Sequence, residues 1–306
     1  MFHKVLVPLD GSWFAEAALP AAARIAKAAG GTLDLVMVRQ PVPALSGMGD
    51  LVVASPEFQR EMLTQDQVYL TETAAGVSAQ RRLTVDYREV DGMAGPEICE
   101  EAARVGADLV VMATHGRGGL RRFWLGGVAD YVVRHIGGPV LLVHPGRTAM
   151  VPEPPAPRRI LVALDLSHAS EAILEPAIAL AWTSGATLTL AHVAEPTFSI
   201  PMSGMPGAQP DLNLLETARA VAQKRLKKIA TRSRRLGLEP DIRVVVGSGA
   251  ADALLNLLDG EEFDLVAMTT HGRGGVRRLL LGSVADQVIR GTTKPVLVLR
   301  PPTPVA

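Results

Sequence analysis

A stretch of 19 residues occurs twice in this chain. Residues 112–130 read MATHGRGGLRRFWLGGVAD, and residues 268–286 read MTTHGRGGVRRLLLGSVAD, at a constant offset of 156 residues and without a gap. Core residues can repeat because a fold has been duplicated. A glycine-rich turn with three arginines has no packing reason to repeat so closely. The repeat therefore predicts two copies of one fold, each with its own binding loop.

The domain organisation follows from this duplication. A chain of 306 residues is long enough for about two domains. A proline-rich segment at 147–156 is predicted to be a semi-extended linker. We therefore expect domains at 1–146 and 157–302. Aromatic residues make up only 4% of the chain, so each core is expected to be aliphatic.

Short runs of Val, Leu and Ile alternate with helical stretches in each half. One continuous helix is expected after each first strand, ending at about Ala29 in the first half and spanning 168–183 in the second. The expected strands are 4–9, 32–38, 84–90, 108–113 and 139–143, and then 160–164, 187–193, 241–246, 264–268 and 295–299. Continuous apolar strands between helices are typical of an α/β fold, with a parallel sheet covered on both faces. We expect two tandem doubly wound, Rossmann-like domains, each with a five-stranded sheet.

The repeated loops and two aspartates fall where such a fold binds ligands. Ligands of open α/β sheets bind beyond the carboxyl ends of the strands, where the strand order reverses. Asp10 and Asp165 each follow a first strand, and each repeated loop follows a fourth strand. In each half, the aspartate and the repeated loop are therefore expected to form one site.

The second loop has the chemistry of a phosphate site. Its glycines permit close backbone approach to a ligand, and Gly282-Ser283 opens a helix whose first amides attract an anion. Arg273 offers fork-shaped donors to phosphate oxygens, and the Ser283 hydroxyl can bind phosphate or Mg²⁺. Simpler roles stay open: Ser283 can cap its helix in a Ser-x-x-Asp box, and Asp10 and Asp165 can cap theirs.

The charge balance and the absence of several motifs exclude some classes of function. Lys plus Arg and Asp plus Glu both number 31, which argues against a general nucleic-acid binder. The chain has no Walker A sequence, no Gly-x-Ser-x-Gly and no metal-ligand spacing of histidines, so we assign no catalytic or metal residue. A single cysteine and the absence of a signal or membrane-spanning sequence favour a cytoplasmic protein.

With these features the chain resembles the universal stress protein family over nearly its whole length, as two tandem domains. Members that bind ATP carry Gly-x2-Gly-x9-Gly-Ser/Thr after the fourth strand. Here Thr269 stands at the first glycine, Gly272 at the second, and Gly282-Ser283 at the end. The first half has Ala113, Gly116 and Gly126-Gly127 there, so both halves lack the first glycine and the first half also lacks the hydroxyl.

The resemblance implies a fold of the adenine nucleotide alpha hydrolase type and an adenine nucleotide, ATP, ADP or AMP, with or without Mg²⁺. Asp165 and Asp10 would contact the ribose or adenine side, and Val193 and Val38 would offer backbone groups to the base. The loop positions expected at the phosphates, with the flanking motif positions, are Thr269, His271, Gly272, Arg273, Gly275, Gly282 and Ser283, and Ala113, His115, Gly116, Arg117, Gly119, Gly126 and Gly127.

By the same resemblance, the protein is expected to be a nucleotide-responsive module in stress tolerance, with a protein partner that the sequence does not name. Two alternatives stay open: a scaffold whose sites are degenerate, and a slow ATPase. Neither nucleic acid nor membrane is expected as a partner, and the sequence is compatible with a homodimer. Because Ser283 is present only in the second half, the second site is ranked above the first.

Overall fold

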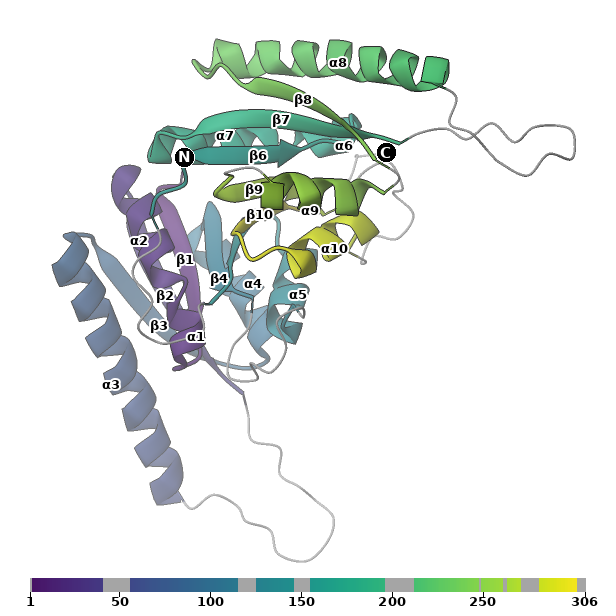
Figure 1. Ribbon diagram of the computed structural model, residues 1–306. Helices are drawn as coiled ribbons and strands as arrows, with labels where there is room; N and C mark the ends of the chain where they lie inside the picture. The colour runs from purple at the N-terminus through teal and green to yellow at the C-terminus, as the bar shows by residue number, and fades with distance from the viewer. Residues whose placement is uncertain are drawn as a thin grey trace, which may run out of the picture. The chain divides into compact units, whose positions relative to one another are not determined.

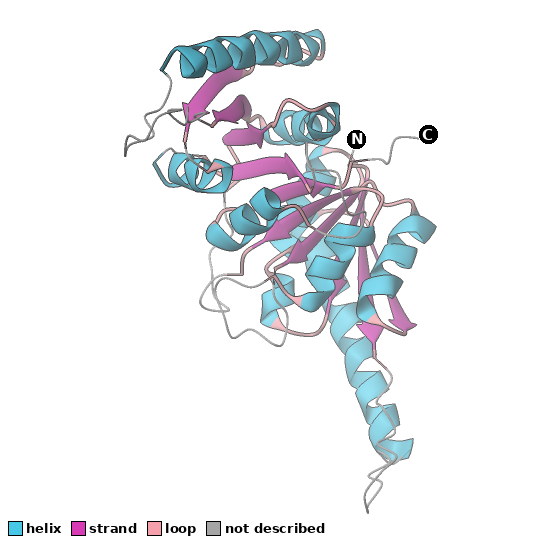
Figure 2. Ribbon diagram, turned by 90° about the vertical axis from the view of Figure 1, so that its right-hand side faces the viewer, coloured by secondary structure: helices cyan, strands magenta, loops and turns pink. Residues whose placement is uncertain are grey.

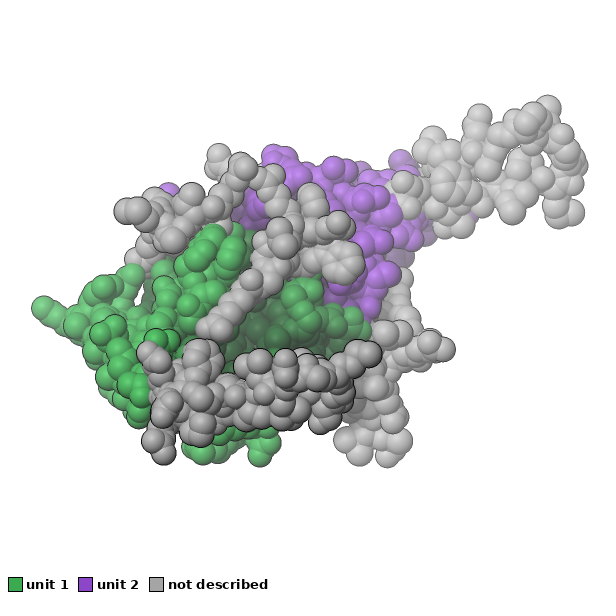
Figure 3. All heavy atoms as spheres, turned by 90° about the horizontal axis from the view of Figure 1, so that it is seen from below, with its two compact units in different colours: residues 1–155 green, residues 156–306 purple. Residues whose placement is uncertain are grey.

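The computed structural model describes residues 2–40, 56–114, 125–145, 155–195, 212–247, 249–260, 263–270 and 281–301. The chain divides into two compact units, residues 1–155 (unit 1) and residues 156–306 (unit 2), which Figure 3 colours separately. Most of the predicted linker lies outside the described residues, and the predicted domain boundaries stay predictions. Each unit is described by itself below.

Unit 1 alternates strands and helices along the chain (Figure 1). Its elements are β1 (Lys4–Leu9), α1 (Trp13–Glu16), α2 (Leu19–Ala28), β2 (Thr32–Arg39), α3 (Pro56–Arg81), β3 (Val85–Asp91), α4 (Ala94–Val105), β4 (Leu109–Ala113), α5 (Gly127–His135) and β5 (Pro139–Val143). All of its strand pairs are parallel, in the order β3-β2-β1-β4-β5.

Unit 2 repeats this order. Its elements are β6 (Arg159–Ala163), α6 (His168–Glu171), α7 (Leu174–Ser184), β7 (Thr187–Ala194), α8 (Leu212–Arg235), β8 (Asp241–Val246), α9 (Ala250–Gly260), β9 (Leu265–Thr269), α10 (Ser283–Gly291) and β10 (Val296–Leu299). The strand order is β8-β7-β6-β9-β10, again with parallel pairs. The predicted strands all appear, within two residues of their expected bounds.

The helix expected after each first strand is divided into two. In unit 1, α1 ends at Glu16 and α2 begins at Leu19. Pro20 stands at the start of α2 and has no N–H to donate to the carbonyl of Glu16, so the α-helical ladder cannot run through this point. Pro176 stands near the start of α7 in unit 2 and has the same effect. The sequence prediction of one continuous helix was wrong in both units.

The strands are buried and aliphatic. In β4 and β9 all five residues are buried, as are the last five residues of β1. Helices pack on both faces of each sheet, as the flanked strands in Figure 2 show. In unit 1, α2 packs with α3 and α4 packs with α5, while both α2 and α4 contact β1 and β2. This arrangement confirms the predicted doubly wound α/β fold.

The topology places a switch point in each unit. The chain moves outward from β1 through β2 to β3, and then returns to the other side of β1 to add β4 and β5. The reversal therefore lies between β1 and β4, and in unit 2 between β6 and β9. No helix among the described residues is long and apolar enough to cross a lipid bilayer.

Candidate functional site

Each switch point gathers the described residues of one candidate site. Site 1 is defined as Asp10, Val38, Gly126 and Gly127, and site 2 as Asp165, Val193, Gly282 and Ser283. Asp10 follows β1 directly, and Gly126, the N-cap of α5, is hydrogen-bonded to Thr114 at the end of β4, so both lie at the carboxyl end of the sheet. The short helix after each aspartate packs against the fourth strand of its unit, α1 against β4 and α6 against β9.

Asp10 and Asp165 are each held by a serine two residues later. The Oδ1 atom of Asp10 accepts hydrogen bonds from the amide of Ser12 at 3.0 Å and from its hydroxyl at 2.5 Å. The Oδ1 atom of Asp165 accepts from the amide of Ser167 at 2.9 Å and from its hydroxyl at 2.6 Å. One carboxylate oxygen of each aspartate is therefore fixed at the strand end by the same turn.

The serines, not the aspartates, cap the helices that follow. Ser12 is the N-cap of α1 and accepts from the amide of Ala15, and Ser167 is the N-cap of α6 and accepts from the amide of Ser170. The alternative in which Asp10 and Asp165 serve as caps is therefore wrong. Their carboxylates orient the capping hydroxyls, and half-buried Asp10 and Asp165 both stand at the switch point.

The strand register sets the place of the two valines. Leu9 pairs with Met37, so Asp10 continues the ladder beside Val38. Ala163 pairs with Ala191, so Asp165 is in register with Val193. Both valines are half-buried. Register therefore brings together the aspartate and the valine that the sequence assigned to each site.

The same hydrogen bond joins the start of α5 and of α10 to the end of the fourth strand of its unit. The amide of Gly126 donates to the carbonyl of Thr114 at 2.8 Å, and the amide of Gly282 donates to the carbonyl of Thr270 at 2.8 Å. Gly126 and Gly282 are N-caps without a side-chain cap. The next helix amides therefore have no partner within the helix, and an anion can bind there.

The structure corrects the capping box proposed for Ser283. Gly282 is the N-cap, so exposed Ser283 is the first helical residue and does not cap the helix. The carboxylate of Asp286 accepts from Arg290 at 2.8 Å, and Asp130 forms the equivalent pair with Arg134 at 2.7 Å. Ser283 is therefore the first residue of a helix whose N-cap provides no side-chain hydrogen bond.

The first turn of α5 offers room for a ligand. A Cβ atom added to Gly127 would have no heavy atom of the described residues within 4 Å. Space therefore adjoins the uncapped amides of unit 1 at the position that Ser283 occupies in unit 2. The chemistry of these helix starts, with amide donors and an aspartate across the switch point, fits a molecule with a phosphate at one end and hydroxyl groups at the other.

Comparison with known proteins gives the family. The model of the universal stress protein family matches residues 1–144 and again residues 157–300. This chain belongs to the universal stress protein family. A universal stress protein of Mycolicibacterium smegmatis is 30% identical over 304 residues, with 98% of this chain and 97% of the relative covered. One from Mycobacterium tuberculosis is 29% identical over 311 residues, with 97% of each covered.

A solved structure confirms the tandem fold of this universal stress protein. The crystal structure of a universal stress protein from Archaeoglobus fulgidus matches with a TM-score of 0.71, covering 98% of this chain and 99% of that chain. The sequence identity is 20%, so this likeness concerns the fold.

Part of the family motif falls outside the described residues: His115, Gly116, Arg117 and Gly119 in the first loop, and His271, Gly272, Arg273 and Gly275 in the second. Ala113 and Thr269, which replace the first motif glycine, end β4 and β9 and are buried. Both sit in strand ladders, so the replacement leaves the strand ends intact. The ligand roles of all these residues stay predictions.

Sequence reasoning missed three features of the sites. Ser12 and Ser167 hold the aspartates, and the repeated Asp-x-Ser spacing was the available signal. The carbonyls of Thr114 and Thr270 anchor the helix starts, and these threonines belong to the repeated stretch itself. Next to site 1, Tyr69 donates its hydroxyl to Glu16 at 2.9 Å. Burial, then the bond to Glu16, raises the pKa of Tyr69 well above its usual value, with a smaller contribution from Asp10.

Proposed function

We propose that this universal stress protein binds an adenine nucleotide at each switch point and acts as a nucleotide-responsive module in stress tolerance. One observation carries the proposal. In both units an aspartate held by a serine and an uncapped helix start occupy the two sides of the switch point. A nucleotide has the matching polarity, with ribose hydroxyls for a carboxylate and phosphates for helix amides.

Each residue of the site would contact a different part of the nucleotide. Asp165 accepts a hydrogen bond from the ribose, and backbone groups at Val193 face the base. The amides at the start of α10 and the Ser283 hydroxyl donate to phosphate oxygens. Charge-assisted hydrogen bonds of this kind contribute about 1.5–3 kcal/mol each. Asp10, Val38 and the start of α5 would do the same in site 1, without a hydroxyl at Gly127.

Magnesium would add charge neutralisation at the phosphates. Oxygen ligands from substrate phosphates and one hydroxyl suit Mg²⁺, which keeps several waters in protein sites. In site 2 the Ser283 hydroxyl is the protein group available for this purpose among the described residues. The described residues hold no cluster of three or more His, Cys, Asp or Glu side chains that could bind a metal by themselves.

The test is a calorimetric titration of the full chain with ATP, with and without Mg²⁺, and with adenosine and tripolyphosphate as partial ligands. We expect ATP to bind more tightly than either fragment, because only ATP engages both sides of the switch point. Mass spectrometry of the denatured protein would detect nucleotide that copurifies. Absence of heat and of bound nucleotide under all conditions would refute the proposal and favour a scaffold with degenerate sites.

A further inference from the structure

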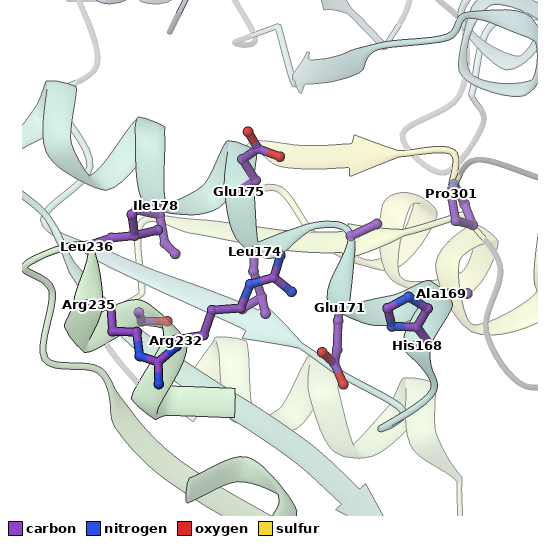
Figure 4. A pocket seen from close by; sticks show the side chains of 12 residues that line it. His168, Ala169, Glu171, Leu174, Glu175, Ile178, Arg232, Arg235, Leu236 and Pro301 are labelled. Carbon is purple, nitrogen blue, oxygen red and sulfur yellow. The ribbon is translucent and has the colours of Figure 1, made fainter. Parts of the chain in front are cut away.

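Unit 2 contains a cavity of about 800 Å³ whose lining includes none of the residues assigned to site 2. It lies between α6 and α7 on one side and the last turns of α8 on the other, with Pro301 at its edge (Figure 4). This volume falls in the range of about 300–1,000 Å³ that is usual for small-molecule sites. We refer to it as the α8 groove.

The α8 groove carries opposite charges on its two walls. Arg232 and Arg235 come from α8, whereas Glu171 and Glu175 come from α6 and α7 (Figure 4). None of these four side chains forms an ion pair or a hydrogen bond with a described residue. Arginine and carboxylate groups that line one groove without pairing leave both charges available to a ligand between them.

A buried hydroxyl adds a third polar group. Ser233 lines the groove, its side chain is fully buried, and its Oγ atom has no hydrogen-bond partner among the described residues. A buried unsatisfied hydroxyl costs free energy that a bound polar group would recover. The equivalent residue in unit 1 is Ser78, whose hydroxyl donates to the carbonyl of Leu83 at 2.9 Å. The arrangement at Ser233 is therefore specific to unit 2.

Between the charged walls the lining is apolar, with Leu174, Ile178 and Leu236 as its main side chains. Unit 1 has different chemistry at the corresponding positions. Val77 and Gln80 stand where Arg232 and Arg235 stand in unit 2. Trp13 and Phe14, at the places of His168 and Ala169, stack on each other with ring centroids 3.8 Å apart.

We propose that the α8 groove binds a zwitterionic organic molecule with an apolar body. Its anionic group pairs with Arg232 and Arg235, its cationic group pairs with Glu171 and Glu175, and its methylene chain lies on the apolar lining. A molecule with a single charge would leave one wall uncompensated. An uncharged molecule would use only the apolar part.

Calorimetry with the full chain tests this proposal. The probes are 8-aminooctanoate, which carries both charges, and octanoate, octylammonium and 1-octanol, which lack one or both. We expect 8-aminooctanoate to bind at least about tenfold more tightly than each of the others, since one lost charge-assisted hydrogen bond corresponds to about that factor. Equal binding of octanoate or 1-octanol, or no binding of 8-aminooctanoate at millimolar concentration, would overturn the proposal.

Variants locate the binding. The double variant Arg232→Gln and Arg235→Gln changes exposed side chains, so it should fold and should bind 8-aminooctanoate at least about tenfold more weakly. Arg234→Gln is the matched control, because Arg234 lies between them on α8, pairs with Glu239 at 2.6 Å and does not line the groove. Unchanged affinity in the double variant would contradict the site.

Discussion

The two units share a backbone framework and differ in the side chains placed on it. The aspartate and serine turn, the glycine N-cap and the hydrogen bond from that glycine to a threonine carbonyl all occur in both units with nearly equal distances. At the next position unit 1 has Gly127 and unit 2 has Ser283. Duplication has therefore kept the groups that would position the proposed nucleotide, and the two sites differ in the hydroxyl that would add a donor to its phosphates.

A second difference concerns the sheet interior. Asp34 on β2 of unit 1 is buried, and its Oδ2 atom has no hydrogen-bond partner among the described residues. The corresponding residue on β7 of unit 2 is Thr189, which is uncharged. Burial raises the pKa of Asp34, an effect opposed by the charge of Lys4. Unit 1 therefore contains a buried carboxyl group where unit 2 has a hydroxyl.

The largest expected effect comes from the glycine N-caps. The variant Gly282→Val retains an extended backbone (φ −61°, ψ 145°) that valine adopts readily, but its side chain obstructs the helix amides. Loss of two charge-assisted hydrogen bonds to phosphate should weaken ATP binding at site 2 at least about 100-fold. Calorimetry measures the change, with Gly260→Val, on the open end of α9, as control. Gly126→Val should remove site 1 alone. Equal loss in the control would contradict this assignment.

The aspartates should have the next largest effect. Asp165→Asn removes the charge that receives the ribose hydroxyl, and we expect about tenfold weaker ATP binding with no change for tripolyphosphate. Ser167→Ala separates binding from stability: loss of its cap should cost about 1 kcal/mol of stability. If Ser167→Ala weakened ATP binding as much as Asp165→Asn, the aspartate would act only by ordering its turn.

Exchange of one residue tests whether the hydroxyl separates the two sites. Gly127→Ser places a hydroxyl where no heavy atom of the described residues obstructs it. The change should strengthen binding at site 1 by about three- to tenfold, the value of one hydrogen bond. Ser283→Gly should weaken site 2 by a similar factor. Site-resolved titration, with the other site blocked by its N-cap valine, measures both. No change in either exchange would show that the hydroxyl is irrelevant to affinity.

The smallest effect is on stability. Burial raises the pKa of Asp34 in the folded state, so folding favours the protonated carboxyl. Its contribution to the free energy of unfolding is fully present below the unfolded pKa of about 3.9. That contribution is lost as the pH rises through the folded pKa. Asp34→Asn should therefore increase the free energy of unfolding at pH 7 by about 1 kcal/mol and not at pH 4. Thermal melting at both pH values checks this, with Asp241→Asn, a change at an exposed residue of β8, as control.

The sequence predicted the fold because its signals are local and duplicated. Apolar runs such as 108–113 and 264–268 defined buried strands, and the repeated stretch located both helix starts. The aspartates at 10 and 165 were placed by the rule for parallel sheets. The division between α1 and α2 was not predicted, because Pro20 interrupts a stretch that is otherwise strongly helical.

The remaining features depend on contacts that no linear pattern reports. The α8 groove joins residues 168–178 to residues 232–236, which are separated by a strand and by most of a long helix. The sequence does not show that the hydroxyl of Ser78 has a hydrogen-bond partner whereas that of Ser233 has none among the described residues. The basic stretch at 219–235 contains two arginines that line this groove.

A crystal structure of the full chain grown with excess ATP tests the central claim most directly. The account predicts phosphate oxygens within about 2.7–3.1 Å of the backbone amides that open α10, close to Ser283, with the ribose beside Asp165 and the same arrangement, at lower occupancy, in site 1. Nucleotide bound elsewhere, or both switch points filled by the protein's own side chains in the presence of excess ATP, would contradict it.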